Sequence, residues 1–194
     1  MEVGEILEVS DQGQWRQWLE KNHKSAKEIW LVYYKKHSGK PRIPYNDAVE
    51  EALCFGWIDS TTKPFDTDRS LQRFTPRRKN SQLSEMNKER IRRLIKDGKM
   101  TQAGLDSISN HLEQGPKSRE ESRQLIEFKF PGDIIQKLKA DPVVWEHYNQ
   151  FPESYKKIRV AWIDGARKRP EVFDQRLRYF IRMTAKNKKF GMVQ

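Results

Sequence analysis

The sequence has a single cysteine, Cys54, among 194 residues. One cysteine excludes an internal disulfide framework and is typical of a protein that stays in a reducing compartment. No uninterrupted apolar stretch approaches the roughly 20 residues that a membrane helix needs. The N-terminal residues carry acids where a secretory signal peptide would have a basic segment and an apolar core. We therefore expect a cytoplasmic protein that does not insert into a membrane.

Common signatures of catalysis and of cofactor binding are also missing. The sequence contains neither G-x-x-x-x-G-K nor G-x-G-x-x-G, which bind phosphate groups, and neither G-x-S-x-G nor H-E-x-x-H. No two cysteine or histidine residues stand at the spacing of zinc ligands. The sequence therefore predicts no metal site and no cofactor, and it leaves open whether the protein is an enzyme.

Positive charge, in contrast, is abundant and unevenly distributed. The formal net charge is +11. Residues 63–99 contain 12 basic and 5 acidic side chains, and residues 156–189 contain 12 basic and 3 acidic ones. Such clustering favours attraction to an anionic partner, but a solvated helix face explains it equally well, so both interpretations stay open.

Hydrophobic periodicity divides the chain into a mixed first half and a helical second half. Runs rich in β-branched and aromatic residues predict strands, and apolar residues three and four apart predict helices. Asn46 and Ser84 are placed to cap helices, and Gly56 to end one. The predicted strands cover residues 6–9, 28–36, 57–63 and 70–75, and the predicted helices begin near residues 11, 46, 84, 101, 142, 155 and 170.

These elements predict an α+β fold class. We expect a small, mainly antiparallel sheet packed with helices in residues 1–113, followed by a helical C-terminal region in residues 128–194. Residues 114–127 are polar, contain Gly-Pro and lack periodicity, so they form the predicted linker.

Cys54 is the first candidate for chemistry. It falls on the predicted inner side of a helix, where a free cysteine behaves as a small hydrophobic residue. A catalytic thiolate needs a partly exposed setting that lowers its pKa, and no histidine is an obvious partner for this one. We therefore interpret Cys54 as structural and assign no catalytic residue.

The candidate ligand-binding residues follow Gly56. Alternation along the first strand of the predicted hairpin would place Trp57, Asp59 and Thr61 on one face. The returning strand carries Arg73, and further arginines precede the next helix. Guanidinium groups, hydroxyls and the backbone N–H groups of a helix start are what a phosphate or carboxylate needs. The candidates are Trp57, Asp59, Arg73, Arg77, Arg78, Ser81, Ser84 and Asn87.

Other interpretations of the basic segments stay open. An Asp–Arg pair across the hairpin beside a capped helix would need no ligand at all. The last predicted helix alternates basic and apolar positions, so it could lie against nucleic-acid phosphates, although no known nucleic-acid-binding motif accompanies it. An enzyme would need a base, for which Asp59 is the leading candidate and Cys54 a distant second.

Several stretches follow one another in a familiar order, among them YNDAVEEALCFGWIDS and LQRFTPRRKNSQLSEMNKERI in the first half and WEHYNQFPESYKKIRVAWIDGARKRPE in the second. Together they resemble the YdeI/OmpD-associated family, also labelled bacteriocin-protection proteins. The resemblance covers nearly the whole chain, although Leu83 replaces a tryptophan common in the family. It implies a cytoplasmic bacterial protein with a role in resistance to bacteriocins or antimicrobial peptides, or in envelope stress, and it supplies no reaction.

With this resemblance, binding of a small anionic ligand becomes the working hypothesis. The pocket would lie between the hairpin and the helix that starts at Ser84. The arginines would supply the positive field, the serines and Asn87 neutral hydrogen bonds, Trp57 an apolar wall, and Asp59 the orientation of the ligand. The oligomeric state and the identity of the ligand stay open.

Overall fold

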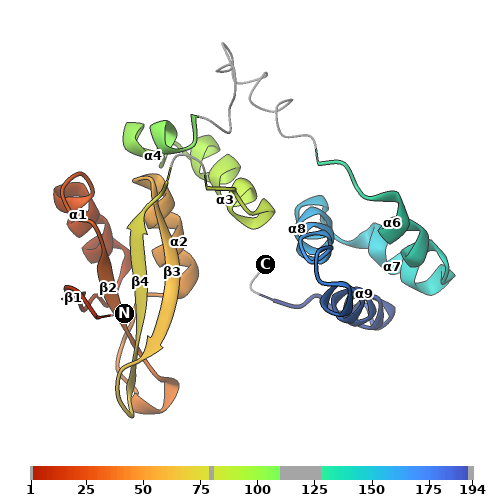
Figure 1. Cartoon of the computed structure of the whole chain (residues 1–194), viewed down its shortest axis with the longest axis horizontal. Helices are drawn as coiled ribbons and strands as arrows, with labels where there is room; N and C mark the ends of the chain where they lie inside the picture. The colour runs from red at the N-terminus through yellow and green to blue at the C-terminus, as the bar shows by residue number, and fades with distance from the viewer. Residues whose placement is uncertain (1, 79–80, 110–127, 192–194) are drawn as a thin grey trace. The chain divides into compact units, whose positions relative to one another are not determined.

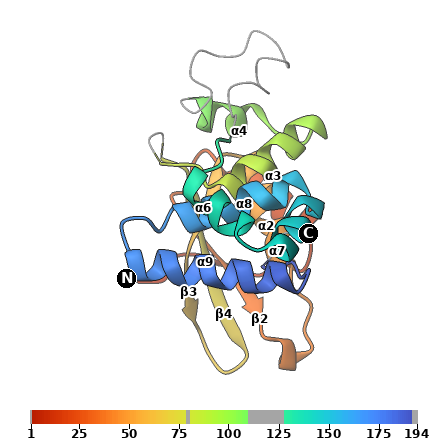
Figure 2. The same cartoon turned by 90° about the vertical axis from the view of Figure 1, so that its right-hand side faces the viewer.

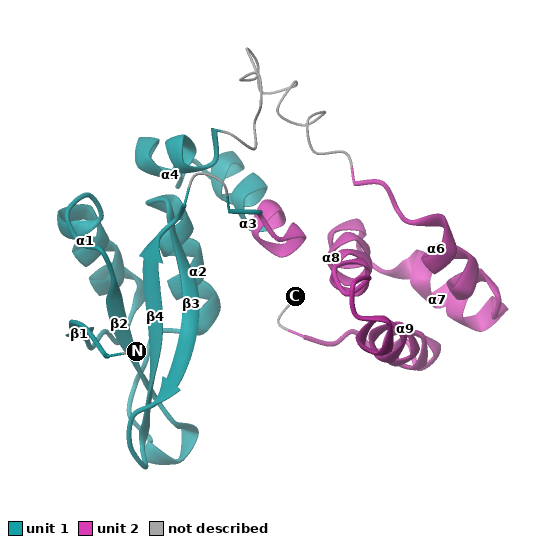
Figure 3. Cartoon of the chain, viewed as in Figure 1, with its two compact units in different colours: residues 1–82, 90–115 teal, residues 83–89, 116–194 magenta. Residues whose placement is uncertain are grey.

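The computed structural model describes residues 2–78, 81–109 and 128–191 (Figure 1). The chain forms two compact units, one made of residues 1–82 and 90–115, the other of residues 83–89 and 116–194 (Figure 3). The expected linker lies outside the described residues, so the boundaries drawn at residues 113 and 128 stay a prediction.

The first unit is built on a four-stranded mixed sheet in the order β1-β2-β4-β3 (Figure 1). β1 (Ile6–Leu7) runs parallel to β2 (Ile29–Tyr34). β4 (Arg69–Pro76) runs antiparallel both to β2 and to its hairpin partner β3 (Trp57–Pro64). Two of the three pairings are antiparallel, which confirms the predicted α+β class and its mainly antiparallel sheet.

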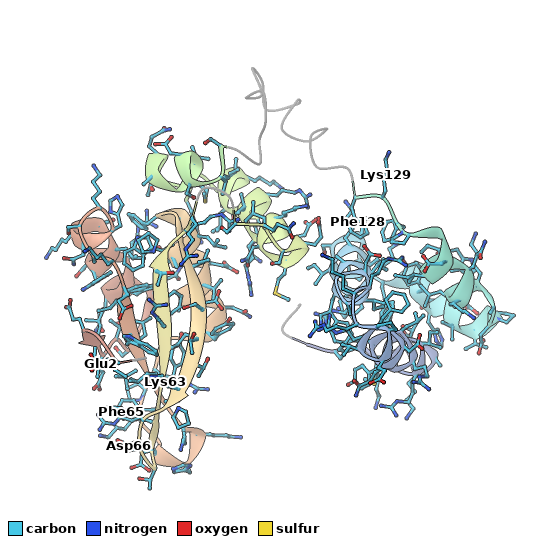
Figure 4. All side chains as sticks on the ribbon, in the orientation of Figure 1. Glu2, Lys63, Phe65, Asp66, Phe128 and Lys129 are labelled. Carbon is cyan, nitrogen blue, oxygen red and sulfur yellow. The ribbon has the colours of Figure 1, made fainter. Side chains whose placement is uncertain are left out.

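The hairpin loop between β3 and β4 is held by its own polar groups. Phe65 and Asp66 lie at this end of the hairpin (Figure 4). One carboxylate oxygen of Asp66 accepts the backbone N–H groups of Asp68 and Arg69, at 2.9 and 2.7 Å. An aspartate that bonds the backbone two and three residues ahead is a frequent means of closing a turn.

Register decides which side chains share a face of the sheet. Asp59 lies opposite Phe74, so the two point to the same side. A bulge follows Asp59 and places Thr62 opposite Gln72, to whose side-chain oxygen it donates a hydrogen bond of 2.5 Å. Thr62 therefore lies on the Asp59 face. Simple alternation had predicted Thr61 on that face, and this prediction was wrong because the bulge shifts the register by one residue.

Two helices cover the Asp59 face. The ring of Trp15, in α1 (Gln12–Asn22), lies 5.4 Å from the ring of Phe74. The indole N–H of Trp15 also donates to the carbonyl of Ala48, in α2 (Tyr45–Cys54), at 3.0 Å. One buried tryptophan therefore ties both helices to the sheet.

The start of α2 differs from the prediction. The helix begins at Tyr45, with Pro44 in the capping position and no side-chain cap. The side chain of Asn46 instead accepts a hydrogen bond from Arg90 of α3 (Glu85–Lys96), at 2.7 Å. Asn46 as the cap was wrong because a partner distant in sequence takes its side chain.

The second unit contains α6 (Gly132–Lys139), α7 (Pro142–Gln150), α8 (Glu153–Asp164) and α9 (Pro170–Ala185). Figure 2 shows α9 along its length. These helices confirm the predicted helical C-terminal region and enclose a core of their own. Among the described residues, no helix is long and apolar enough to cross a membrane. The buried core residues are Ile134, Leu138, Val144, Tyr148, Phe151, Tyr155, Val160, Ile163, Leu177 and Phe180.

Candidate functional site

A short hydrogen bond joins Asp59 to the start of α2. The Tyr45 hydroxyl donates to Oδ2 of Asp59 at 2.5 Å. Burial, and then the hydrogen bond to the Asp59 carboxylate, raise the pKa of Tyr45 well above its ordinary value. The hydroxyl therefore stays protonated and keeps donating to Asp59 across the physiological pH range.

A second tyrosine belongs to the same neighbourhood. The Tyr33 side chain in β2 is 7% exposed, and its hydroxyl has no hydrogen-bond partner among the described residues. Burial raises the pKa of Tyr33, and electrostatic interaction with Tyr45 and Asp59 raises it further. The guanidinium of Arg42 lies 5.8 Å from the Tyr33 ring and acts in the opposite direction. A buried hydroxyl without a partner therefore lies within electrostatic reach of both Asp59 and Arg42.

Arg90 brings a further positive charge to this neighbourhood. It donates to Asn46, and its Nε lies 3.9 Å from a carboxylate oxygen of Glu50. Burial lowers the pKa of Arg90, whereas Glu50, Tyr45 and Asp59 act to raise it. Arg90 thus remains a cation within reach of the Tyr45–Asp59 pair. We call Tyr33, Arg42, Tyr45, Asp59 and Arg90 the Asp59 cluster.

Arg73 does not join this cluster. It lies opposite Trp30 in the sheet. Because Arg73 is next to Phe74 in β4, its side chain points to the face opposite that of Phe74 and Asp59. There it donates to one carboxylate oxygen of Glu28 through both Nε, at 2.8 Å, and Nη2. The alternative of an Asp–Arg pair across the hairpin therefore does not hold for Asp59 and Arg73, because these two side chains lie on opposite faces of the sheet.

Arg77, Arg78 and Ser81 are hydrogen-bonded to one another after β4. Arg77 is buried, which lowers its pKa, and its guanidinium donates to the carbonyl of Ser81. The carbonyl of Arg78 accepts both the backbone N–H and the hydroxyl of Ser81, at 3.0 and 2.8 Å. The structure therefore brings these three candidates together through bonds among themselves.

The remaining candidates have clear local roles. The Ser84 hydroxyl accepts the backbone N–H of Asn87 at 3.2 Å, as its predicted place at the start of a helix requires. Both residues are grouped with the second unit, so a pocket shared with the hairpin stays a prediction. Trp57 is buried and its indole donates to the carbonyl of His23 at 3.1 Å. It is thus a core residue on the same face as Asp59.

Cys54 is fully buried at the end of α2. Burial raises the pKa of its thiol to about 11, and the nearby Glu51 carboxylate adds to the effect. At neutral pH the thiol is therefore protonated, which supports the structural interpretation. Within the described ranges, no group of three or more histidine, cysteine, aspartate or glutamate residues could hold a metal ion.

The sequence pattern had not singled out Tyr33, Arg42, Tyr45 or Arg90. Tyr33 is part of a run of strand-forming residues in which every side chain is buried, so it resembles an ordinary core residue. Tyr45 carries a detectable signal, since it follows Pro44 at a helix start and precedes two polar residues. Arg42 and Arg90 reach the cluster only through tertiary structure.

Two family models match the chain. Residues 7–107 match a domain of unknown function, DUF8412, and residues 127–187 match the model described as Bacteriocin-protection, YdeI or OmpD-Associated. The Asp59 cluster lies within the first match and α6 to α9 within the second. No curated protein and no solved structure matches the chain. The chain therefore belongs to the family of the first model, which spans more than half of it. Its C-terminal region matches the Bacteriocin-protection, YdeI or OmpD-Associated model, in agreement with the predicted resemblance.

Proposed function

We propose that the protein binds a small anionic ligand at the Asp59 cluster, and that this binding serves a cytoplasmic role in protection against bacteriocins or in envelope stress. The observation that carries the proposal is the buried hydroxyl of Tyr33, which bonds to none of the residues that the structure describes. A buried hydroxyl left without a hydrogen bond costs about 1–3 kcal/mol. Proteins retain such a group where a ligand or a bound water supplies the missing hydrogen bond.

The groups around this hydroxyl favour a ligand that has a hydrogen-bond donor at one end and an anionic group at the other. Oδ2 of Asp59 accepts from Tyr45, while Oδ1 accepts from none of the described residues. An N–H or O–H donor on the ligand would satisfy Oδ1. The Tyr33 hydroxyl and the exposed guanidinium of Arg42 are both donors, and together they suit a carboxylate or phosphate. The ligand we propose is therefore a small carboxylated or phosphorylated metabolite that also carries an amine or hydroxyl group.

A matched pair of tyrosines in β2 provides the test. Tyr33 and Tyr34 are neighbours, each 7% exposed, and they point to opposite faces. The Tyr34 hydroxyl is bonded to Glu8 at 2.9 Å, whereas the Tyr33 hydroxyl has no partner. Tyr33→Phe should make the ligand-free protein more stable by up to about 1–3 kcal/mol, because the unsatisfied hydroxyl is gone, and Tyr34→Phe should destabilise it by about 1 kcal/mol.

Binding is measured by calorimetry and by thermal shift at constant ionic strength. The probes are β-alanine, which carries both ends, and propionate and propylammonium, which carry one end each. We expect β-alanine to bind better than either single-ended probe. Tyr33→Phe and Asp59→Asn should each weaken binding about tenfold or more, since a hydrogen bond to a charged group is worth about 1.5–3 kcal/mol.

Equal affinity of Tyr33→Phe and the natural protein for β-alanine would contradict the proposal. If Tyr33→Phe is less stable than the natural protein and the natural protein binds none of the probes, a bound water supplies the hydrogen bond of this hydroxyl instead of a ligand. The same measurements on Arg77→Ala and Ser84→Ala test whether the candidates after β4 contribute to the binding of β-alanine.

A second candidate function, binding of single-stranded nucleic acid, is favoured by a groove on α9. The groove has a volume of about 370 Å³ and, among the described residues, is lined by Gln175, Arg178, Tyr179 and Arg182. The guanidinium of Arg182 lies 5.2 Å from the Tyr179 ring. A positively charged groove with an aromatic ring is the common means of holding single strands without sequence preference.

Salt dependence separates this second candidate from the first. Binding of a fluorescent oligonucleotide should weaken steeply between about 50 and 200 mM salt, because counterions are released from the phosphates. Tyr179→Ala should weaken it about fivefold or more, since stacking of one base is worth about 1–3 kcal/mol. Tyr33→Phe should bind the oligonucleotide as the natural protein does. A salt-independent affinity would count against the groove as the contact surface.

A further inference from the structure

Arg159 of α8 carries a charge in an almost closed environment. Its side chain is 5% exposed, and its Nε is buried without a hydrogen-bond partner in the described part of the chain. The guanidinium lies over three aromatic rings, at 4.7 Å from Phe190, 5.5 Å from Tyr155 and 5.9 Å from Trp162. Burial lowers the pKa of Arg159, and no carboxylate of the described residues acts on it. We call Tyr155, Arg159, Trp162 and Phe190 the Arg159 cage.

Other arginines of the same unit are partnered. Arg167 forms ion pairs with Asp133 and Asp164. Arg176 also stacks on Trp162, at 4.6 Å, but its Nη1 donates to the carbonyl of that residue. A scarcity of acceptors in this unit therefore does not explain why Arg159 has none.

The aromatic rings only partly compensate the buried charge. Cation–π contacts offset some of the desolvation cost of an arginine, but they use the faces of the guanidinium and leave its N–H groups unbonded. Those N–H groups form a planar fork that matches the oxygens of a carboxylate or a phosphate. An oxyanion with two oxygens would accept the buried Nε–H together with a second N–H group of the same fork.

The C-terminal segment lies directly against the guanidinium. The backbone N–H of Phe190 donates to the Tyr155 hydroxyl at 3.1 Å, which holds its ring in the cage. The next residue is Gly191, with φ of +79°, and a Cβ atom there would stand 2.8 Å from Nη2 of Arg159. The positive φ favours glycine at this position, and the absence of a Cβ lets the backbone approach the guanidinium closely.

We propose that the Arg159 cage is a binding site for a small oxyanion, a carboxylate or a phosphate group. The oxyanion accepts hydrogen bonds from the fork of Arg159, and the three rings form apolar walls around it. Neither family match assigns this site, and it lies in a different unit from the Asp59 cluster. The two sites can therefore be tested independently.

The Nε–H signal of Arg159 in ¹⁵N–¹H spectra reports directly on the cage. The full chain is titrated with inorganic phosphate in one series and acetate in another, at constant ionic strength with sodium chloride. We expect a saturable shift of the Arg159 signal and a rise in melting temperature with one of the two anions, which identifies the oxyanion class. A signal that moves with neither anion would overturn the proposal.

Two arginine variants separate binding from structure. Arg159→Met removes the fork and keeps the side-chain volume; it should abolish the response to the anion and melt no lower than the natural protein, because an unpaired buried charge is gone. Arg176→Met is the matched control, since it also removes a guanidinium that stacks on Trp162 and should keep the anion response. A lower melting temperature for Arg159→Met, with no anion response in the natural protein, would show that the cage is structural.

Arg159→Lys gives an independent check that does not remove the charge. A lysine retains a cation but has no planar fork, so the affinity for the anion should fall about tenfold while the melting temperature stays within a few degrees. An affinity equal to that of the natural protein would mean that the site recognises charge alone, contrary to the proposed forked contact.

Discussion

Arg73 and Arg159 show how differently one residue type can be used in this protein. Arg73 lies at the sheet surface and is matched by Glu28, which neutralises it. Arg159 is almost fully buried and matched by aromatic rings alone. A partly exposed ion pair contributes little to stability, whereas an unpaired buried charge is costly and needs a reason. At the residue scale, Arg159, which has no carboxylate partner among the described residues, is therefore a better candidate than Arg73 for binding an anion.

The Arg73–Glu28 pair predicts a small, acid-sensitive contribution to stability. The hydrogen bonds from Arg73 lower the pKa of Glu28, so the contribution is complete above the ordinary carboxylate pKa and is lost as the pH falls through the lowered value. Glu28→Gln should cost up to about 1 kcal/mol at pH 7 and nothing near pH 2, measured by urea unfolding. A cost that is unchanged at both pH values would argue that packing, and not charge, is involved. Arg73→Ala should leave β-alanine binding unchanged.

Cys54 should be chemically inert in the folded protein. Its buried thiol has a pKa of about 11, so almost no thiolate forms at pH 8. We expect alkylation by iodoacetamide to be at least about a hundredfold slower in the native protein than in urea. Since the unfolded thiol ionises at lower pH than the folded one, stability should also fall as the pH rises from about 9 to 11. Rapid native-state labelling at pH 8 would contradict this burial.

At the scale of the elements, a backbone contact explains the glycine in the segment after α3. The Thr101 hydroxyl and backbone N–H both donate to the carbonyl of Cys54, at 2.6 and 3.1 Å. They attach α4 (Gln102–Ser107) to the end of α2. A Cβ on Gly104 would collide with this same carbonyl. The two helices can therefore meet only where one of them has no side chain.

Gly104→Ala tests this contact. The added methyl should force the two helices apart and destabilise the protein by about 1–3 kcal/mol, measured by urea unfolding. Gly132→Ala is the control, because Gly132 lies at the start of α6 and a Cβ there would meet nothing within 4 Å. If the two variants have the same free energy of unfolding, α4 and α2 do not pack closely at Gly104.

At the scale of the whole molecule, each compact unit has a core and a candidate site of its own. The Asp59 cluster lies on the helix-covered face of the sheet in the first unit, and the Arg159 cage lies among the helices of the second. We expect each unit, with its own core, to unfold in its own transition. A ligand for one site should therefore stabilise one unit more than the other.

Leu138→Ala separates the two units in calorimetry. Leu138 is fully buried in the core of the second unit, so its truncation should cost about 2–5 kcal/mol there. We expect the thermal transition that phosphate or acetate raises to move down in this variant, while the transition that β-alanine raises stays in place. A single transition that shifts as a whole would mean that the units unfold together.

The sequence by itself determined the fold class, the strands and most of the helices, because these depend on neighbours along the chain. The exception is α6, which begins at Gly132 and was not among the predicted helices. Asp141 followed by Pro142 predicts the start of α7, and Asp141 does accept the backbone N–H groups of Val143 and Val144. Gly56 ends α2 with a positive φ, as predicted. The family match in the C-terminal region was likewise recognisable from short motifs.

Only the tertiary structure decided which polar groups meet. Arg73 and Asp59 both belong to the hairpin, but the pairing of β2 with β4 shows Arg73 turned towards Glu28 on the opposite face. The unpartnered hydroxyl of Tyr33 and the unpaired charge of Arg159 have no local signature, because a missing partner is a property of everything packed around a group. Composition and spacing describe what a residue can do, and long-range packing decides whether anything nearby has already satisfied it.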